Sequence, residues 1–392
     1  MSKASLARQI ALDFAGTQSP IVPLSRPGSE NSLDPALIVT SEAQVLNTFL
    51  QPAATQPYLL LEGDALHRLS QLPSEAVDTV ITSPPYWGQR EYGVTHSRGT
   101  EIGGEATLDY YIQVLARVFQ EIKRVLKPTG SLWLNIGDSY ADKKLLSIPW
   151  RLAIHLQDAQ GWVLRNDVVW NKMKGAPDNS KDKLRNAHEF VFHFVQQKKY
   201  YYDVDAIRNT AKSSTVRDGV VLTATGVSGI NYRRQIARSP DLSDAEKANA
   251  LATLEATLQK VARGELSDFR MIIRGRQRAT HSESPNVSGR AAELLKKGFC
   301  ILPYDPAGSK PGDVWDIVPE DTWRTDSHCA PFPLQLCILP IKATCPPGGI
   351  VLDPFVGTGT VPLAAQRLQR RAIGIDLYPE YLELARQRLA AG

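Results

Sequence analysis

The chain has 392 residues, of which 43% are hydrophobic and 22% are charged, and its formal net charge at pH 7 is +4. This composition is that of a folded globular protein and excludes a disordered chain, with enough material for one large domain and a second lobe. The excess of positive charge is mild. It therefore favours a polyanionic partner only weakly and leaves that question to local clusters of charge.

The chain contains four cysteines: Cys300, Cys329, Cys337 and Cys345. They form no C-x-x-C pair and have no histidines at zinc spacing, so we predict reduced thiols and no metal site. No run approaches the ~18 apolar residues of a membrane span, and Gln9 and Asp13 interrupt what would have to be the apolar core of a signal peptide. The sequence predicts a soluble, cytoplasmic protein without a membrane partner.

The first 50 residues are rich in Ser, Pro, Ala and Leu and lack periodicity. Chain breakers such as Ser19-Pro20 predict an irregular N-terminal arm, with a short helix near Ser41 to Phe49. From Tyr58 the pattern changes to an apolar strand that ends in Gly63-Asp64 and is followed by a short helix.

A second apolar strand, Val77 to Ile81, runs into the polar loop Thr82-Ser83-Pro84-Pro85-Tyr86-Trp87. Proline cannot continue a central strand, so this loop lies at the strand's carboxyl end, where open parallel sheets bind ligands. A stiff loop with a hydroxyl, carbonyls and an aromatic face suits a flat polar ring such as a nucleobase. Taken alone, the loop fits equally well a simple strand terminator, with Tyr86 and Trp87 in a core.

Apolar residues at helical spacing predict a helix over Leu108 to Leu126, stopped by Lys127-Pro128-Thr129-Gly130, and then a strand from Ser131 to Asp138. This order predicts a parallel crossover. A further helix, 149–157, precedes two apolar strands, 162–172 and 188–194, that flank a polar loop. His188-Glu189 suggests a metal or acid–base pair, but without a second histidine at helical spacing we interpret it as structural.

Between about 209 and 312 the composition changes. A well-capped amphipathic helix, Ser243 to Arg263, is interpreted as a packing helix of a smaller lobe. Basic residues gather around it: Arg233, Arg234, Arg238, Arg270, Arg274, Arg276 and Arg278. Such a cluster is either a solvated face or a surface for phosphate and guanine contacts.

Near the end of the chain, a strand ending at Asp353 leads into the glycine-rich segment 354–360. Glycines let the backbone turn tightly and approach a ligand at the start of a helix. A further strand, Ala372 to Asp376, ends in an acid about 20 residues on, which is the position that holds ribose hydroxyls in nucleotide-binding folds.

Together, Ser83-Pro84-Pro85-Tyr86 and the run from Asp353 to Thr360 resemble the S-adenosylmethionine-dependent amino-methyltransferases of DNA, which methylate exocyclic amines of bases. The family's motifs are (D/N/S)-P-P-Y and D-P-F-x-G-x-G-T, and the catalytic motif comes first here, as in the family's beta arrangement. The resemblance extends to Gly130–Tyr140 and to H-x-A-P-F-P at 328–333, where Cys329 replaces a frequent proline. It covers about 59–210 and 315 to the end of the chain.

The resemblance implies an α/β fold: a Rossmann-like, doubly wound, mostly parallel sheet in circularly permuted order, with an inserted smaller target-recognition region. The implied parts are an N-terminal arm (1–50), the catalytic half of the methyltransferase domain (51–208), the target-recognition region (209–312) and the cofactor-binding half (313–392). Permutation requires Asp353 and Ser83 to lie on neighbouring strand ends.

The resemblance also implies roles for individual residues. The catalytic residues are Ser83, Pro84, Pro85 and Tyr86. The cofactor-binding residues are Asp64, Phe332, Asp353, Pro354, Phe355, Gly357, Gly359, Thr360 and Asp376. The base pocket holds Trp87, Trp170 and Lys172, and the DNA-binding residues are Arg233, Arg234, Arg270, Arg274, Arg276 and Arg278. Asp64 has a second interpretation, as the cap of the helix that follows it.

The implied reaction is methyl transfer from S-adenosylmethionine to the exocyclic amine of a base flipped out of double-stranded DNA. The Ser83 hydroxyl and Pro84 carbonyl would accept hydrogen bonds from the amine, and Tyr86 would stack on the ring. Serine at the first motif position favours cytosine N4, as do Trp170, Lys172, Pro177 and His188-Glu189. Cytosine C5 chemistry is disfavoured because no cysteine follows a proline.

Other functions stay open at this point: adenine N6 methylation, a catalytically silent regulator that binds DNA and cofactor, and methylation of a small molecule or protein. A basic insertion of this size argues against the last. The expected partners are double-stranded DNA and a cognate restriction endonuclease that acts on the same site without a stable complex. Both a monomer and a homodimer fit, and association with the nucleoid would follow from DNA binding.

Overall fold

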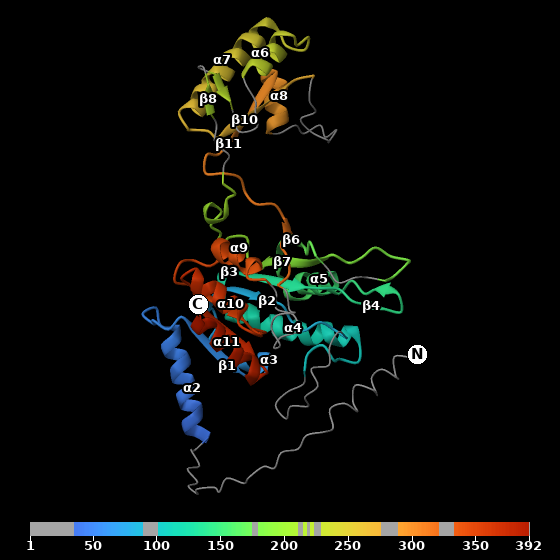
Figure 1. The fold of residues 1–392 in the computed structure, drawn as a ribbon, viewed down its shortest axis with the longest axis vertical. Helices are drawn as coiled ribbons and strands as arrows, with labels where there is room; N and C mark the ends of the chain where they lie inside the picture. The colour runs from blue at the N-terminus through green and yellow to red at the C-terminus, as the bar shows by residue number, and fades with distance from the viewer. Residues whose placement is uncertain are drawn as a thin grey trace, which may run out of the picture. The chain divides into compact units, whose positions relative to one another are not determined.

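The computed structural model describes residues 35–88, 101–174, 179–210, 215–217, 220–222, 229–275, 289–320 and 333–391 (Figure 1). The chain divides into two compact units, 1–51 and 52–392. In the first unit, helix α2 (Pro35–Leu50) contains the helix expected near 41–49 and begins earlier. The rest of the expected N-terminal arm, residues 1–34, lies outside the described residues.

The second unit is built on an eight-stranded sheet with the order β1-β14-β13-β2-β3-β7-β6-β12 (Figure 1). The strands, in chain order, are β1 (Tyr58–Glu62), β2 (Val77–Thr82), β3 (Leu126–Ile136), β6 (Val163–Asn171), β7 (His188–Val195), β12 (Val314–Asp316), β13 (Ile350–Asp353) and β14 (Arg371–Asp376). Pairing is parallel from β1 to β3, antiparallel around β7, and parallel between β6 and β12.

The centre of this sheet joins the two ends of the chain. Strand β13 pairs with β2, so that Leu352 lies opposite Val80 although the two are far apart in sequence. Both strands are buried along their whole length, as expected for near-continuous apolar runs in a parallel sheet. The predicted mostly parallel α/β fold in permuted order is confirmed.

Helices cover both faces of the sheet (Figure 1). One group is α3 (Ala65–Gln71), α4 (Leu108–Val125) and α5 (Ile148–Gln160), and the other is α9 (Gln335–Thr344), α10 (Thr360–Arg367) and α11 (Pro379–Ala391). Helix α4 shows the sequence logic: Thr107 caps it, and its apolar face, including Phe119 and Ile122, is fully buried. The sequence predicts that Lys127 to Gly130 separates helix α4 from the next strand. In the structure these residues belong to the irregular start of β3 instead.

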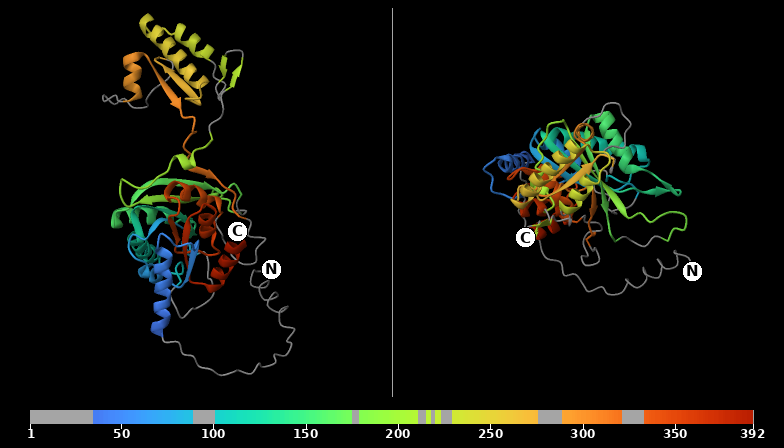
Figure 2. Two further views of the ribbon diagram at one scale, coloured as in Figure 1. Left: turned by 90° about the vertical axis from the view of Figure 1, so that its left-hand side faces the viewer. Right: turned by 90° about the horizontal axis from the view of Figure 1, so that it is seen from above.

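The inserted lobe has a hydrophobic core of its own, separate from the core of the sheet. It consists of α6 (Gly229–Ala237), α7 (Asp244–Ala262), β10 (Asp268–Ile273), α8 (Arg290–Lys297) and β11 (Phe299–Tyr304). Within this lobe, Figure 2 shows α6 and α7 together beside the antiparallel pair β10–β11. Ser243 and Glu246 form a complete capping box at the start of α7, and Leu254 and Val261 are buried, which confirms the packing helix.

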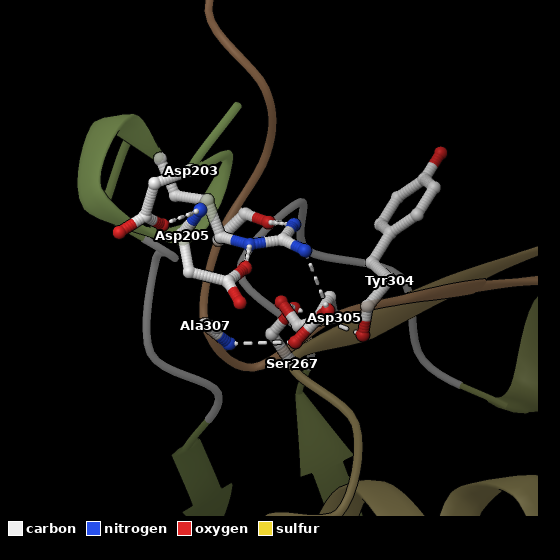
Figure 3. Close-up of polar contacts among 8 residues, drawn as sticks. Asp203, Asp205, Ser267, Tyr304, Asp305 and Ala307 are labelled. Atoms are coloured by element: carbon white, nitrogen blue, oxygen red, sulfur yellow. Dashed lines mark hydrogen bonds and ion pairs between the residues drawn. The ribbon is translucent and has the colours of Figure 1, made fainter. Parts of the chain in front are cut away.

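Two chain segments lead into and out of the lobe, and polar contacts join them (Figure 3). The Arg208 guanidinium lies 2.6 Å from a carboxylate oxygen of Asp205 and 3.3 Å from one of Asp305. The backbones of Asn209 and Ser309 also pair in an isolated bridge.

The smaller elements are the β4–β5 hairpin (Tyr140–Ala141 and Lys144–Leu145), β8–β9 (Thr215–Arg217 and Val220–Leu222) and the 3-10 helix η1 (Asp205–Ile207).

Cys300, Cys337 and Cys345 are buried free thiols, as predicted, and burial raises the pKa of Cys345 to about 12. Cys329 lies outside the described residues. In the part of the chain that the structure describes, no helix combines the length and hydropathy needed to cross a membrane. The same residues contain no group of three or more His, Cys, Asp or Glu arranged to hold a metal ion.

Candidate active site

The two motifs meet through a direct hydrogen bond. Thr82, the last residue of β2, donates its hydroxyl to Asp353 Oδ1 at 2.8 Å, and both side chains are buried. The bond spans 271 positions in sequence and joins the ends of neighbouring parallel strands. The expectation that the catalytic and cofactor motifs share one edge of the sheet is confirmed, with Thr82 as a contact that the sequence did not single out.

Asp353 leaves one polar atom without a partner. Its Oδ1 accepts from Thr82 and from the Phe355 backbone N–H at 3.1 Å, whereas its buried Oδ2 has no partner among the described residues. Burial of the carboxyl, which is 1% exposed, raises its pKa to about 7. A buried acceptor without a donor is costly, so this oxygen fits a site completed by a bound polar group.

Asp376 anchors the glycine-rich turn. Its Oδ2 accepts from the Gly357 N–H at 2.8 Å and its Oδ1 from the Tyr378 N–H at 3.0 Å. Burial raises the pKa of this carboxyl to about 6. The predicted ribose contact therefore has a second component: the same carboxylate fixes the backbone against which a nucleoside would lie.

The turn itself requires glycine. Gly359 has φ +82° and precedes α10, and a Cβ at this position would lie 2.9 Å from the Cβ of Ala385. Pro354 is buried and Phe355 is half-buried. The buried Thr360 hydroxyl lies 3.4 Å from the Arg388 guanidinium on α11, and a contact of Thr360 with the cofactor stays a prediction.

Asp64 lies at the same edge, because β1 is the neighbour of β14. Its Oδ1 accepts from the His67 N–H at 2.8 Å, so the alternative interpretation as a helix cap is confirmed. The second carboxylate oxygen is not used in the cap. The role of Asp64 in cofactor binding stays a prediction, and Phe332 lies outside the described residues.

The catalytic loop is held by hydrogen bonds from outside it. The Tyr111 hydroxyl donates to the Pro85 carbonyl at 2.8 Å, and the Trp87 indole N–H donates to the Glu105 carbonyl at 2.8 Å. Ser83 and Tyr86 are half-buried rather than part of the core. Since Tyr111 takes the Pro85 carbonyl, and no contact to the Pro84 carbonyl is found among the described residues, Pro84 remains the backbone acceptor that the prediction assigned.

A carboxylate not assigned by the sequence lies beside this loop. Glu189, at the start of β7, accepts from the Tyr86 hydroxyl at 2.9 Å and from the Asn135 side-chain amide at 3.1 Å. Lys172 forms an ion pair with it at 2.5 Å. From the sequence, His188-Glu189 is interpreted as structural; the sequence signal for Glu189 is the pattern that resembles cytosine-N4 relatives, which assigns this residue no contact with the loop.

Two base-pocket predictions receive different answers. Lys172 is connected to the loop by its ion pair with Glu189, which in turn accepts from the Tyr86 hydroxyl. Trp170 does not line an open pocket, because it is 4% exposed, packs in the sheet's core and donates its indole N–H to the Ile317 carbonyl at 2.8 Å. The prediction for Trp170 is corrected: its ring is part of the core, and Lys172, just beyond the end of β6, covers it with an ammonium 5.1 Å from the ring centre.

The arginines of the lobe also divide. Arg233 forms an ion pair with Glu255 at 2.7 Å, and Arg274 donates to the Asp241 carbonyl and to Glu246 at 2.8 Å, so both are engaged within the lobe. Arg233, Arg234 and Arg270 are all exposed, and Arg270 also takes part in an interaction. Arg276 and Arg278 lie outside the described residues. The predicted basic cluster is therefore partly neutralised by acids that are distant in sequence.

Comparisons with known proteins agree with this geometry. The family model described as DNA methylase matches residues 77–387. The Type II methyltransferase M.XycI of Xanthomonas campestris pv. cyanopsidis is 32% identical over 368 residues, covering 86% of this chain and 90% of the relative. The Type II methyltransferase M.SmaI of Serratia marcescens is 30% identical over 359 residues, covering 84% of this chain and 90% of the relative.

Among solved structures, the cytosine-N4-specific PvuII DNA methyltransferase covers 86% of this chain and 87% of its own, with a TM-score of 0.52 and 17% sequence identity, a likeness of fold. The unpartnered Asp353 oxygen, the glycine turn and Asp376 fit S-adenosylmethionine as the cofactor of this edge. The chain belongs to the DNA methylase family and is an S-adenosylmethionine-dependent amino-methyltransferase that acts on DNA.

Proposed function

We propose that the protein transfers a methyl group to the exocyclic N4 amine of a cytosine that is flipped out of double-stranded DNA. The observation that carries this proposal is the loop from Ser83 to Tyr86, fixed at the carboxyl end of β2 and bonded through Thr82 to Asp353. When bound, S-adenosylmethionine supplies an electrophilic methyl group on a sulfonium. The chain's own residues then have to bring the amine to it.

The target amine is a poor nucleophile because its lone pair is delocalised into the ring. Acceptors for its two N–H groups hold the nitrogen in line and favour a tetrahedral geometry. The Ser83 hydroxyl and the Pro84 carbonyl are these acceptors. The half-buried ring of Tyr86 offers a face for stacking, a contact worth about 1–3 kcal/mol per base that offsets part of the cost of flipping.

Serine at the first motif position supports cytosine N4 over adenine N6, as the family resemblance implies. The arrangement of Lys172 and Glu189 beside the loop supports the same choice, since both belong to the pattern associated with cytosine-N4 relatives. The names of the Type II relatives support a place in a restriction–modification system, with a separate endonuclease that acts on the same site.

We assign target recognition to the inserted lobe, with the exposed Arg234 and Arg270 as the described residues that approach DNA. Arginine binds phosphates through charge and guanine through paired donors, so both phosphate and base-edge contacts are open to these side chains. The domain limits 209 and 312 serve as the working boundaries of this region.

The deciding experiment is to incubate the purified protein with unmethylated plasmid DNA and labelled S-adenosylmethionine, and to sequence the product with a chemistry that separates N4-methylcytosine from N6-methyladenine. We expect N4-methylcytosine at one short recognition sequence, and labelling with the Ser83→Ala variant that is about 10²–10³-fold slower. N6-methyladenine would establish the alternative base. Binding of DNA and cofactor without transfer by the wild-type protein would instead identify a silent regulator.

A further inference from the structure

A chain of three side chains leads from the catalytic serine into the sheet. The Ser83 hydroxyl lies 3.4 Å from the Tyr86 hydroxyl, which lies 2.9 Å from Glu189 Oε2. The first distance is long for an O–H···O hydrogen bond, as is common in sites without substrate, where such contacts tighten on binding. The three groups come from two elements that are separated by about 100 residues in sequence.

Glu189, at the buried end of this hydrogen-bonded series, decides which hydroxyl donates and which accepts. Glu189 accepts from Lys172 on Oε1 and from Asn135 and Tyr86 on Oε2, so its carboxylate faces donors only. The Tyr86 hydroxyl must therefore donate inward, which leaves its oxygen lone pairs facing Ser83. Ser83 then donates its single proton to Tyr86, and both acceptor sites of its own oxygen remain for the target amine.

Packing holds the chain in this geometry. A Cβ on Gly137 would lie 2.8 Å from the Tyr86 ring and 3.1 Å from Glu189 Oε1, so the backbone of this segment is in close contact with both. The Glu189 side chain is 12% exposed and that of Lys172 is 28% exposed. Burial, with the negative charge of Glu189, raises the pKa of Tyr86 well above its usual value, so the phenol stays a donor.

From these contacts we infer that Glu189 is a positioning residue for methyl transfer: acting through the Tyr86 hydroxyl, it turns the Ser83 oxygen into an acceptor for the amine. The inference rests on the proposed function and adds a residue to it. It also gives Tyr86 a second task besides stacking, and it gives Lys172 the task of holding the carboxylate that directs the chain.

The test compares Tyr86→Phe, Glu189→Gln and the double variant. Phenylalanine keeps the stacking ring and removes the link. Glutamine keeps the shape of Glu189, but its single oxygen cannot face Lys172 on one side and Tyr86 with Asn135 on the other. The readout is the single-turnover methylation rate at saturating unmethylated plasmid DNA and S-adenosylmethionine, measured beside the Kd of each. Asp182→Asn, which breaks the exposed ion pair with Lys143, is the matched control.

We expect each single variant to lower the single-turnover rate by about 10²-fold, the scale of loss when a reacting group is misplaced, with Kd values within about twofold of wild type. The double variant should be no slower than the slower single variant, because one chain is broken in either case. If the fold-losses of the two single variants multiply in the double variant, the inference is overturned. A wild-type rate in either single variant would overturn it as well. If the wild-type protein transfers no methyl group, the proposed function falls as well.

Discussion

The edge of the sheet and the inserted lobe are both rich in polar residues, but they use them differently. At the sheet edge, Asp353, Asp376 and Glu189 gather donors from neighbouring strand ends. In the lobe, Arg233 and Arg274 are held by acids and carbonyls of the lobe itself. Polar groups at the edge thus converge from separate strands on the proposed site, whereas Arg233 and Arg274 are engaged within the lobe itself.

This difference shows that the structural effect of a motif can be predicted from the sequence, whereas the contacts of a charge cluster cannot. Proline fixes φ at its own position and glycine permits a positive φ at its own, so the effect of each is local and readable. An arginine's partner is decided by packing of remote segments. The comparison predicts that variants at the edge change chemistry or cofactor binding, while variants in the lobe change DNA affinity or folding.

The largest effect should come from Ser83→Ala, which deletes an acceptor at the reacting amine and leaves the prolines and Tyr86 in place. We expect the single-turnover rate to fall about 10²–10³-fold, the usual loss for one preorganised hydrogen bond at a reacting centre, with little change in DNA affinity. Ser70→Ala, on the exposed surface of α3, is the control. A wild-type rate in Ser83→Ala would reduce the serine to a loop residue and erase the contrast with the lobe.

Asp353 predicts a pH dependence that belongs to the sheet edge alone. Its pKa of about 7 in the folded protein lies above the ordinary value of 3.8, so the folded state binds more protons than the unfolded chain between those values. The contribution of Asp353 to the free energy of unfolding should therefore fall by roughly 2–4 kcal/mol as pH rises from about 4 to 7, with Asp376 acting in the same direction. The buried His193, whose pKa burial lowers to about 3, acts in the opposite direction.

Denaturant unfolding of the cofactor-free protein across this pH range measures the slope. Asp353→Asn removes the titrating group and keeps an acceptor for Thr82, so stability relative to the wild type should rise between about pH 4 and pH 7. Parallel profiles for the wild type and the variant would show that Asp353 does not hold a proton in the folded state.

Asp376→Ala should weaken cofactor binding by about 1.5–3 kcal/mol, the range for losing hydrogen bonds to a charged acceptor. The structure adds a finer test, since Asp376→Asn keeps an oxygen for the Gly357 N–H. If the carboxylate acts mainly on ribose, both variants weaken binding; if it acts mainly on the turn, asparagine restores much of the affinity. Calorimetry with S-adenosylmethionine decides, with the exposed Asp158→Ala as the control. Unchanged affinity in both variants would remove Asp376 from the site.

The smallest effects should separate two arginines of the lobe. Arg234→Ala should lower DNA affinity by about 1 kcal/mol or less and reduce the salt slope by about one if it contacts a phosphate. Arg274→Ala should instead lower the free energy of unfolding by about 1–2 kcal/mol, because it removes charge-assisted hydrogen bonds to Glu246 and Asp241, and leave the salt slope unchanged. If both variants changed the same quantity, DNA affinity or the free energy of unfolding, the assignment of Arg234 to DNA and of Arg274 to the lobe's own contacts would be wrong.

The sequence by itself determined the fold class and the position of the two motifs. Apolar runs closed by Pro84-Pro85 and by Gly357 and Gly359 specify strands that end in turns, because proline fixes φ and glycine permits a positive φ wherever they stand. The cap at Asp64 and the capping box at Ser243 were readable for the same reason, since both are local hydrogen bonds.

Only the tertiary structure decided which side chains meet. Thr82 reaches Asp353, and Glu189 reaches Tyr86, because strands from both ends of the chain and an antiparallel return strand place them side by side. Trp170 belongs to the core and Arg274 to the lobe's own contacts for the same kind of reason. A residue's type states which bonds it can make, but the partner is supplied by segments whose approach depends on the packing of the whole fold.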